Sequence, residues 1–176
     1  MQTVLFEGLV FREFLDDDAE EFANAARESV NTVGPWMSWC SPSFSSQDAL
    51  NWFQQCRLDN ASQSACEFGV FSQESGAFLG GGGLNSINHQ NLFCNLGYWV
   101  RETAQRQGIA KRTVQTLVPY AFEVLRMQRV EIVIAQGNTA SEAVARKCGA
   151  QFEYLARNRL QVHGRAVAAS IFSVIP

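Results

Sequence analysis

Residues 105–112 read Gln105-Arg106-Gln107-Gly108-Ile109-Ala110-Lys111-Arg112 and directly follow a predicted strand, Leu92–Val100. An apolar-periodic helix is predicted to begin within them, at Ile109, and to run to about Arg126. A helix N-terminus presents unpaired N–H groups and the positive end of the helix dipole, and it therefore binds phosphate oxygens. The glycine lets the backbone approach a ligand closely, the alanine keeps the first turn uncrowded, and three side chains add positive charge. This stretch predicts a site for a phosphate-bearing ligand.

Further motifs stand on both sides of this loop. Leu96-Gly97-Tyr98-Trp99-Val100 precedes it. After the helix come a predicted strand, Val130–Ala135, and the segment Gly137-Asn138-Thr139-Ala140-Ser141, which opens a short helix. That helix ends at Lys147-Cys148-Gly149-Ala150.

In these motifs the sequence resembles the GNAT N-acetyltransferases, and most closely their RimJ/RimL-like branch, which acetylates the N-termini of ribosomal proteins. In that family a G-Y-W strand precedes a Q/R-x-x-G-x-G/A loop that cradles the pyrophosphate of acetyl-CoA, and an N-x-x-S helix follows. The resemblance runs from about Leu9 to Val174. It implies one GNAT acetyltransferase domain over residues 1–176. The implied fold class is α/β (α+β): a single mixed, mostly antiparallel twisted sheet of six to seven strands flanked by helices.

The resemblance also implies the co-substrate, acetyl-CoA, and a chemistry that needs no metal. By the family's pattern, the expected cofactor-binding residues are Tyr98, Trp99, Val100, Gln105, Arg106, Gln107, Gly108, Ile109, Ala110, Lys111, Asn138 and Lys147. Taken without the resemblance, the first three form only an aromatic strand. Backbone groups at its end could pair with the pantetheine amides and polarise the thioester carbonyl.

Ser141 is the candidate for the group that lies beside the reacting sulfur. Many members of the family place a tyrosine later on the same helix as general acid, but the matching position here is Ala145. The RimL-like branch carries a serine instead, and this chain keeps it at Ser141. The alternative is an ordinary helix-start serine.

The general base is harder to place. The glutamate of RimL-like enzymes matches Leu160, and an aspartate expected near Arg165-Ala166-Val167 is absent. Glu67, in the predicted strand Cys66–Ser72, is taken as the second catalytic candidate, and His89 is the other side chain that could substitute. Both also fit an exposed surface position.

Amine basicity bears on the substrate. A free α-amine, with a pKa near 8, is roughly 10–15% neutral at pH 7, whereas a lysine amine is only about 0.04% neutral. The difference corresponds to roughly 3 kcal/mol, which is the contribution that a good base would otherwise make. A site without an obvious base is therefore better matched to an α-amine, of a peptide N-terminus or of a free amino acid.

Charge is distributed unevenly along the chain. Residues 1–88 carry three arginines and twelve carboxylates, a balance of −9, and residues 89–176 carry eleven Lys/Arg and five glutamates, a balance of +6. The basic half suits a polyanionic cofactor and the acidic half a cationic acceptor, although both also suit a solvated surface. Trp36 and Trp39, in a proline-bounded loop, are the candidate substrate-binding residues; their alternative is a small core beneath that loop.

Composition limits the class of protein. The apolar fraction of 47% in 176 residues fits one folded domain. The sequence shows no signal-peptide pattern and no apolar run of about 20 residues. Its five cysteines include no C-x-x-C pair, which favours reduced thiols in a cytoplasmic protein and argues against zinc. Neither nucleic acid nor membrane is expected as a partner, and the chain is expected to be a monomer or a homodimer.

Local patterns predict the remaining elements. The alternating pattern of Leu5–Arg12 predicts one strand. The segment Asp16-Asp17-Asp18 is expected to cap a helix that ends near Ser29. Ser45 and Asp48 resemble a capping box for a helix at Gln47–Leu58. Further strands are predicted at Ala77–Leu84, Gln151–Arg157 and Val167–Ile175. An antiparallel meander should form the middle of the sheet, and the motif segment should add a parallel unit. Pro119 should kink or interrupt the long helix.

The function predicted from these observations is acetyl-CoA-dependent transfer of an acetyl group directly to a primary amine. The most probable acceptor is the α-amine of a protein or peptide N-terminus, a ribosomal protein among them. Alternatives are a small-molecule N-acetyltransferase, acting on an amino acid, polyamine or antibiotic amine, and a CoA-binding module without turnover. A doubly wound dinucleotide enzyme fits less well, because the loop is not G-x-G-x-x-G.

Overall fold

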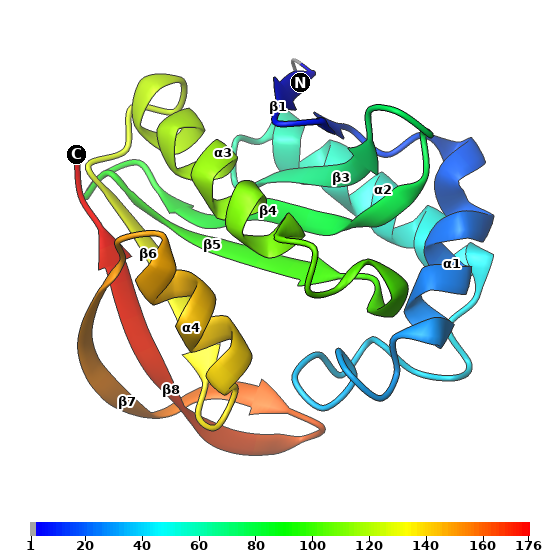
Figure 1. The fold of residues 1–176 in the computed structure, drawn as a ribbon. Coiled ribbons are helices and arrows are strands. Elements are labelled where there is room, and N and C mark those ends of the chain that lie inside the picture. The colour runs from blue at the N-terminus through cyan, green and yellow to red at the C-terminus, as the bar shows by residue number, and fades with distance from the viewer. Residues whose placement is uncertain (1–2) are drawn as a thin grey trace.

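The computed structural model describes residues 3–176, which form one sheet with helices on both faces (Figure 1). The α-helices are α1 (Ala19–Glu28), α2 (Ser46–Ala61), α3 (Ile109–Glu123) and α4 (Thr139–Lys147), with short 3-10 helices at η1 (Asp16–Asp18) and η2 (Glu102–Ala104). The strands are β1 (Val4–Phe6), β2 (Leu9–Arg12), β3 (Cys66–Ser72), β4 (Phe78–Asn88), β5 (Phe93–Val100), β6 (Arg129–Ala135), β7 (Gln151–Val162) and β8 (Arg165–Val174).

The strand order is β1-β2-β3-β4-β5-β6-β8-β7. Every neighbouring pair is antiparallel except β5 and β6, which are parallel and connected through α3. The predicted fold class, the antiparallel middle and the parallel unit are therefore confirmed. The sheet has eight strands in residues 3–176, one more than the upper prediction.

The additional strand comes from the N-terminal segment, where the prediction of one continuous strand was wrong. Glu7 and Gly8 have positive φ values of 45° and 79°, so the chain turns back between β1 and β2 and pairs with itself. Hydrophobic alternation could not show this turn, because Phe6 and Leu9 belong to an apolar pattern that continues through it.

Two of the helix-start predictions have different outcomes. The Ser45 capping box is confirmed: the Asp48 N–H donates to Ser45 Oγ at 3.2 Å, and the Ser45 N–H donates to the Asp48 carboxylate at 2.9 Å. The Asp16–Asp18 segment instead forms η1, and the Asp18 side chain makes no cap contact with α1. Asp18 accepts from the Leu15 N–H and from Arg12, at 2.7 Å each, and so fixes the turn that leads from β2 to α1.

The two faces of the sheet bury separate cores. One core packs α3 against the central strands, around Phe68, Leu96 and Leu117. The other packs α1 and α2 on the opposite face, around Phe14, Phe22 and Phe53, whose rings contact one another. Helix α3 continues through Pro119 to Glu123 and ends three residues before its predicted end. No helix within residues 3–176 is long and apolar enough to cross a membrane.

The β7–β8 hairpin curves back so that its tip reaches the loop after α1 (Figure 1). At the tip, the His163 N–H donates to Ser38 Oγ at 2.7 Å, and His163 Nε2 lies 2.8 Å from the Gly34 carbonyl oxygen. The hairpin is longer than predicted, because β7 extends to Val162. The hairpin thereby connects the C-terminal part of the sheet to the loop after α1, which contains Trp36 and Trp39.

An ion pair holds the start of β7 against β6 and β8. The Glu153 carboxylate accepts hydrogen bonds from Arg129 at 2.6 and 2.7 Å and from the Ser173 hydroxyl at 2.6 Å. These hydrogen bonds, that of Arg129 foremost, lower the pKa of Glu153 to about 2. Since the unfolded value is about 4.3, this pair stabilises the fold above that pH and loses its effect as the pH falls towards 2.

We therefore expect Glu153→Gln to lower the Tm at pH 7, and its deficit relative to wild type to shrink below pH 4 and become small as the pH approaches 2. Thermal unfolding followed by circular dichroism across this range measures the difference. Glu74→Gln, in the exposed turn between β3 and β4, is the control. A Tm deficit of Glu153→Gln that is equally large at both pH values would contradict the ion-pair assignment.

Candidate functional site

The central feature of the site is a fork between β5 and β6. Their parallel pairing covers only the three register pairs from Phe93↔Arg129 to Asn95↔Glu131, after which the two strands separate (Figure 1). Just past the last pair, the Val133 N–H donates to the side-chain oxygen of Asn95 at 3.3 Å. The opposite edge of β5 stays paired with β4 as far as Val100. One edge of Tyr98–Val100 is thus left without a neighbouring strand.

A cleft of about 550 Å³ lies at this fork, between the N-termini of α3 and α4; we call it the basic cleft. Its cationic lining residues are Arg106, Lys111 and Lys147. Of the twelve predicted cofactor residues, all but Gln107 line it. The Gln107 side chain instead donates to the Thr103 carbonyl at 3.1 Å.

The loop before α3 has the conformation of an anion site. Arg106 and Gly108 have positive φ values of 62° and 78°, and Gly108 is the N-cap of α3 without any side-chain cap. The first N–H groups of the helix therefore have no side-chain partner. A Cβ on Gly108 would meet no protein atom within 4 Å, so within the protein it is the positive φ that favours glycine there. Arg112 points elsewhere and donates to the carbonyls of Glu7 and Gln107.

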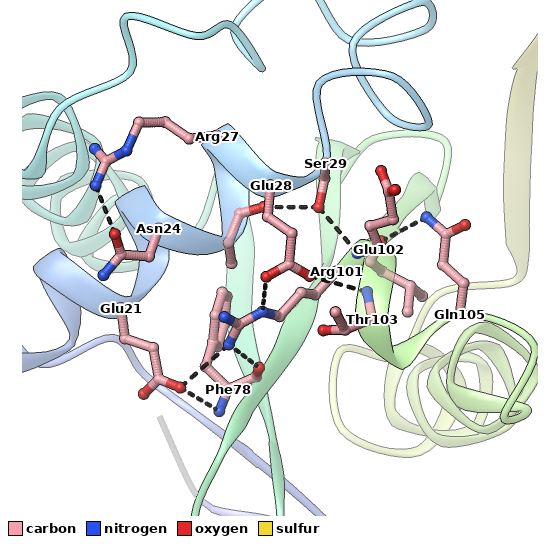
Figure 2. A network of polar contacts seen from close by, with 12 residues as sticks. Glu21, Asn24, Arg27, Glu28, Ser29, Phe78, Arg101, Glu102, Thr103 and Gln105 are labelled. Carbon is pink, nitrogen blue, oxygen red and sulfur yellow. Dashed lines mark hydrogen bonds and ion pairs between the residues drawn. The ribbon is translucent and has the colours of Figure 1, made fainter.

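A polar network fixes this loop against α1 (Figure 2). Arg101, at the end of β5, donates to Glu28 at 2.9 Å and contacts Glu21 at 3.4 Å. The backbone N–H of Thr103 donates to the Glu28 carboxylate at 2.9 Å. The N–H of Glu102 donates to the buried hydroxyl of Ser29 at 3.0 Å. Helix α1 thus holds the segment that leads into the cleft.

Gln105 extends the same network to the strand edge (Figure 2). Its side-chain amide donates to Thr32 Oγ1 at 3.0 Å and to the Val100 carbonyl at 3.1 Å. Gln105 therefore connects the loop, the end of β5 and the segment after α1, while it still lines the basic cleft. In this arrangement its side chain positions the loop.

Two hydroxyl groups meet inside the cleft. The phenol oxygen of Tyr98 lies 2.8 Å from Ser141 Oγ, and the Ser141 N–H donates to Asn138 Oδ1 at 3.1 Å, which caps α4. Burial raises the pKa of Tyr98 to about 12, so the phenol stays protonated at neutral pH. The sequence motif indicated only the backbone of Tyr98; its hydroxyl, delivered beside Ser141 across the fork, was missed.

A second cavity, of about 360 Å³, lies on the α1/α2 face; we call it the aromatic cavity. Its aromatic lining includes Phe14, Phe22, Trp39, Phe44, Trp52 and Trp99. The two cavities share Met37, Tyr98 and Trp99 as lining residues, so they meet at the unpaired end of β5. Of the two predicted substrate residues, Trp39 lines the aromatic cavity and Trp36 lines the basic cleft.

Glu67 is the carboxylate of the aromatic cavity. It reaches across from β3 and lies over Gly83 of β4, where a Cβ would overlap its carboxyl group. Asn85 donates to Glu67 at 3.3 Å, and Asn95 donates to Asn85 at 2.9 Å. Desolvation by burial raises the pKa of Glu67 to about 7, against the opposing effect of the Asn85 hydrogen bond. Glu67 is therefore partly ionised at neutral pH.

The other sequence candidates lie outside the two cavities. His89 is exposed in the turn between β4 and β5, with Nε2 2.9 Å from the Gln63 carbonyl, and lines neither cavity. All five cysteines are free thiols. Burial raises the pKa of Cys94 to about 12 and also raises that of Cys148. Residues 3–176 contain no cluster of three His, Cys, Asp or Glu side chains arranged to hold a metal ion.

A strand fork, an uncapped helix N-terminus on a basic cleft and an adjoining acceptor-sized cavity define an acyl-transferase type of site. The family model of the GNAT acetyltransferase domain matches residues 8–151, and the chain belongs to this family of N-acetyltransferases.

Relatives and solved structures place the chain near the ribosomal-protein branch. A candidate ribosomal-protein-serine acetyltransferase from Vibrio cholerae is 35% identical, with a TM-score of 0.89 over 99% of this chain and 98% of that one. YdaF of Bacillus subtilis (strain 168), a candidate ribosomal N-acetyltransferase, is 28% identical over 90% of this chain and 86% of its own length. A RimL structure in complex with coenzyme A has the same fold: TM-score 0.89, 20% identity, 99% and 98% coverage.

The raised pKa of Glu67 gives a prediction that is independent of any activity. Because this carboxyl group is harder to ionise in the folded than in the unfolded state, it destabilises the fold progressively between about pH 4.3 and 7. Glu67→Gln should raise the Tm relative to wild type at pH 8 and leave it nearly unchanged at pH 4. Carboxyl-carbon NMR should place the pKa of Glu67 near 7; a value near 4 would refute the assignment.

Proposed function

We propose that this protein transfers the acetyl group of acetyl-CoA directly to the α-amine of a protein or peptide N-terminus. The observation that carries the proposal is that the basic cleft and the aromatic cavity meet at the unpaired edge of β5. The cleft offers cations and helix N–H groups for a pyrophosphate, and the cavity offers a carboxyl group and aromatic walls for an amine. The two co-substrates of an acetyl transfer would meet there.

On the cofactor side, the loop before α3 would hold the pyrophosphate, and the free edge of Tyr98–Val100 would pair with the pantetheine amides. Backbone donors on that edge would also stabilise the negative charge that develops on the thioester oxygen. Similar folds support this assignment: RimL is described in complex with coenzyme A, and MccE, at 20% identity and TM-score 0.90, with acetyl-CoA and AMP.

On the acceptor side, Glu67 is the base. Its pKa near 7 leaves a substantial ionised fraction at neutral pH, which suits proton removal from an α-ammonium with pKa near 8. The amine nitrogen then attacks the thioester carbon, the C–N bond forms, and the C–S bond breaks. The nitrogen then loses its second proton, and the departing thiolate gains one through the hydrogen-bonded hydroxyl groups of Ser141 and Tyr98, which would both end the step protonated. The proton held by Glu67 passes to solvent.

Direct transfer agrees with the state of the cysteines. Cys94 is buried, and Cys94 and Cys148 line neither cavity. Their raised pKa values leave little thiolate at neutral pH. The presence of the Glu67 carboxyl group in the aromatic cavity favours an active enzyme over a CoA-binding module without turnover. The names of the Vibrio cholerae and Bacillus subtilis relatives favour a ribosomal protein as the acceptor. Such an acceptor would agree with the expected cytoplasmic location.

Mass spectrometry of acetylated products tests the acceptor class. The protein is incubated with acetyl-CoA at neutral pH and a panel of short peptides with different N-termini, free amino acids and polyamines. We expect acetylation of peptide α-amines, with internal lysines unmodified. Products confined to free amino acids or polyamines would replace the proposal with a small-molecule acetyltransferase, and the absence of any product would favour the non-catalytic module.

Two substitutions test the assigned roles. Glu67→Gln should lower kcat/KM about 10²-fold to 10⁴-fold, the range for loss of a general base, and should remove the acidic limb of the pH profile near pH 7. Ser141→Ala should lower kcat and leave acetyl-CoA affinity unchanged, because the pyrophosphate contacts lie elsewhere. A kcat close to the wild-type value in Glu67→Gln would refute the role of Glu67 as base, and in Ser141→Ala it would refute the role of Ser141 at the thiolate. Glu74→Gln again serves as control.

A further inference from the structure

The aromatic cavity has a floor of glycines. Register pairs connect Gly69 to Gly81, Gly83 to Gly97, and Gly81 to Trp99, and directly opposed residues project to the same face of a sheet. A row of positions without side chains therefore faces α1 and α2. Gly81 of β4 and Gly97 of β5 line the cavity, so side chains at these two positions would take up part of its space.

Three of these four glycine positions are covered and one is open. A Cβ on Gly69 would lie 2.5 Å from the ring of Phe71 and 2.9 Å from the ring of Phe14. A Cβ on Gly81 would lie 2.9 Å from the indole nitrogen of Trp99, and a Cβ on Gly83 would overlap the carboxyl group of Glu67. A Cβ on Gly97 would meet only the amide nitrogen of Asn85, at 3.7 Å. The open space over Gly97 thus lies directly beside the Glu67 carboxyl group, on the strand whose other edge faces the basic cleft. This is where an acceptor amine can approach both the base and the thioester.

Beyond this point the cavity is almost entirely apolar. Glu67 and Asn85 bond to each other, and the hydroxyl group of Tyr98, which also lines the cavity, lies 2.8 Å from Ser141 Oγ. The walls are aromatic rings, among them Trp39, which packs against Phe22, Phe44 and Trp99 at centroid distances of 5.2 to 5.9 Å. Trp39 and Trp52 are 37% and 38% exposed and so mark its mouth. A volume of about 360 Å³ accommodates one large side chain in addition to the amine.

We propose, on the basis of the proposed function, that this cavity is the subsite for the first residue of the acceptor and that it selects large apolar first side chains, such as those of Met, Leu or Phe. The α-amine lies over Gly97 beside Glu67, and the side chain packs between Trp39 and Trp52. A seryl, alanyl or glycyl terminus leaves most of the apolar wall in contact with water, so this chain would differ in its preferred first residue from the Vibrio cholerae relative, whose name specifies serine. A lysyl terminus would bring a second cation into a space whose one carboxyl group is already engaged by the amine.

The size of the preference follows from the apolar area involved. A methylene group more or less in a hydrophobic pocket changes specificity about 10-fold to 200-fold. Met, Leu or Phe would bury several such groups more than Ala or Ser. Allowing for partial exposure at the mouth, kcat/KM should be about 10-fold to 100-fold higher for the large apolar termini.

The test uses the full-length protein, acetyl-CoA and peptides that differ only in their first residue: Met, Leu, Phe, Ala, Ser, Gly or Lys. Initial rates of peptide acetylation, read by mass spectrometry, give kcat/KM for each. Higher values for Met, Leu and Phe than for Ala and Ser support the subsite. Equal or higher values for Ala, Ser or Lys overturn it and leave N-terminal acetylation itself intact. Turnover of free amines without turnover of any peptide would instead refute the proposed function, and the subsite with it.

Two variants locate the preference in this cavity. Trp52→Ala removes a partly exposed wall and should lower kcat/KM for the Phe peptide about 10-fold more than for the Ala peptide. Leu58→Ala, on the exposed surface of the same helix and outside both cavities, should change neither. Equal losses for both peptides in Trp52→Ala would overturn the role of this wall.

Gly97→Ala places a methyl group where the amine is expected, at ordinary contact distance from Asn85. It should lower kcat/KM for every peptide at least 10-fold while the KM for acetyl-CoA and the Tm stay close to wild type. Wild-type kcat/KM for peptides in this variant would place the amine elsewhere and overturn the proposed orientation of the acceptor.

Discussion

The end of hydrogen bonding between β5 and β6 is the constraint on which the site depends. Three register pairs hold the strands together, and beyond them the unpaired N–H of Val133 is taken by the side chain of Asn95. A buried backbone donor without a partner costs about 1–3 kcal/mol, so a fork in a sheet needs such a substitute. The side chain of Asn95 is this substitute. Asn95 also donates a hydrogen bond to Asn85, which in turn donates one to Glu67. The residue that stabilises the fork is thereby linked to the carboxyl group beside it.

The glycines of β4 have a second consequence. Gly80 to Gly83 weaken the strand by entropy and by the loss of packing side chains. Because these positions carry no side chains, the side chain of Trp99 can lie over Gly81 and that of Glu67 over Gly83. Glu67 can thus place its carboxyl group over the neighbouring strand, although its own backbone is on β3. In the proposed mechanism, the base therefore comes from β3, whereas the family resemblance places it at Leu160, in β7.

The sequence predicted the elements whose signals are local. The strand Cys66–Ser72, the capping box of α2 and the loop before α3 follow from alternation, cap chemistry and a glycine of positive φ, and all three are found. Contacts between segments distant in the chain were not predictable. Nothing in one sequence indicates that Tyr98 reaches Ser141, 43 residues later, or that His163 contacts Gly34. The N-terminal hairpin was missed because an apolar pattern runs through its turn.

The structure changes the interpretation of the acidic residues in the first half of the chain, residues 1–88. Its excess charge suggested attraction of a cationic acceptor, but several of these carboxylates are engaged within the fold. Glu21 and Glu28 form ion pairs with Arg101 (Figure 2). Asp18 forms an ion pair with Arg12, and Asp48 completes the capping box of α2. Helix α1 contributes a wall to the aromatic cavity through Phe22 and fixes the loop of the basic cleft through Glu28 and Ser29. The same helix therefore connects the aromatic cavity with the basic cleft, and its carboxylates Glu21 and Glu28 are engaged in this connection.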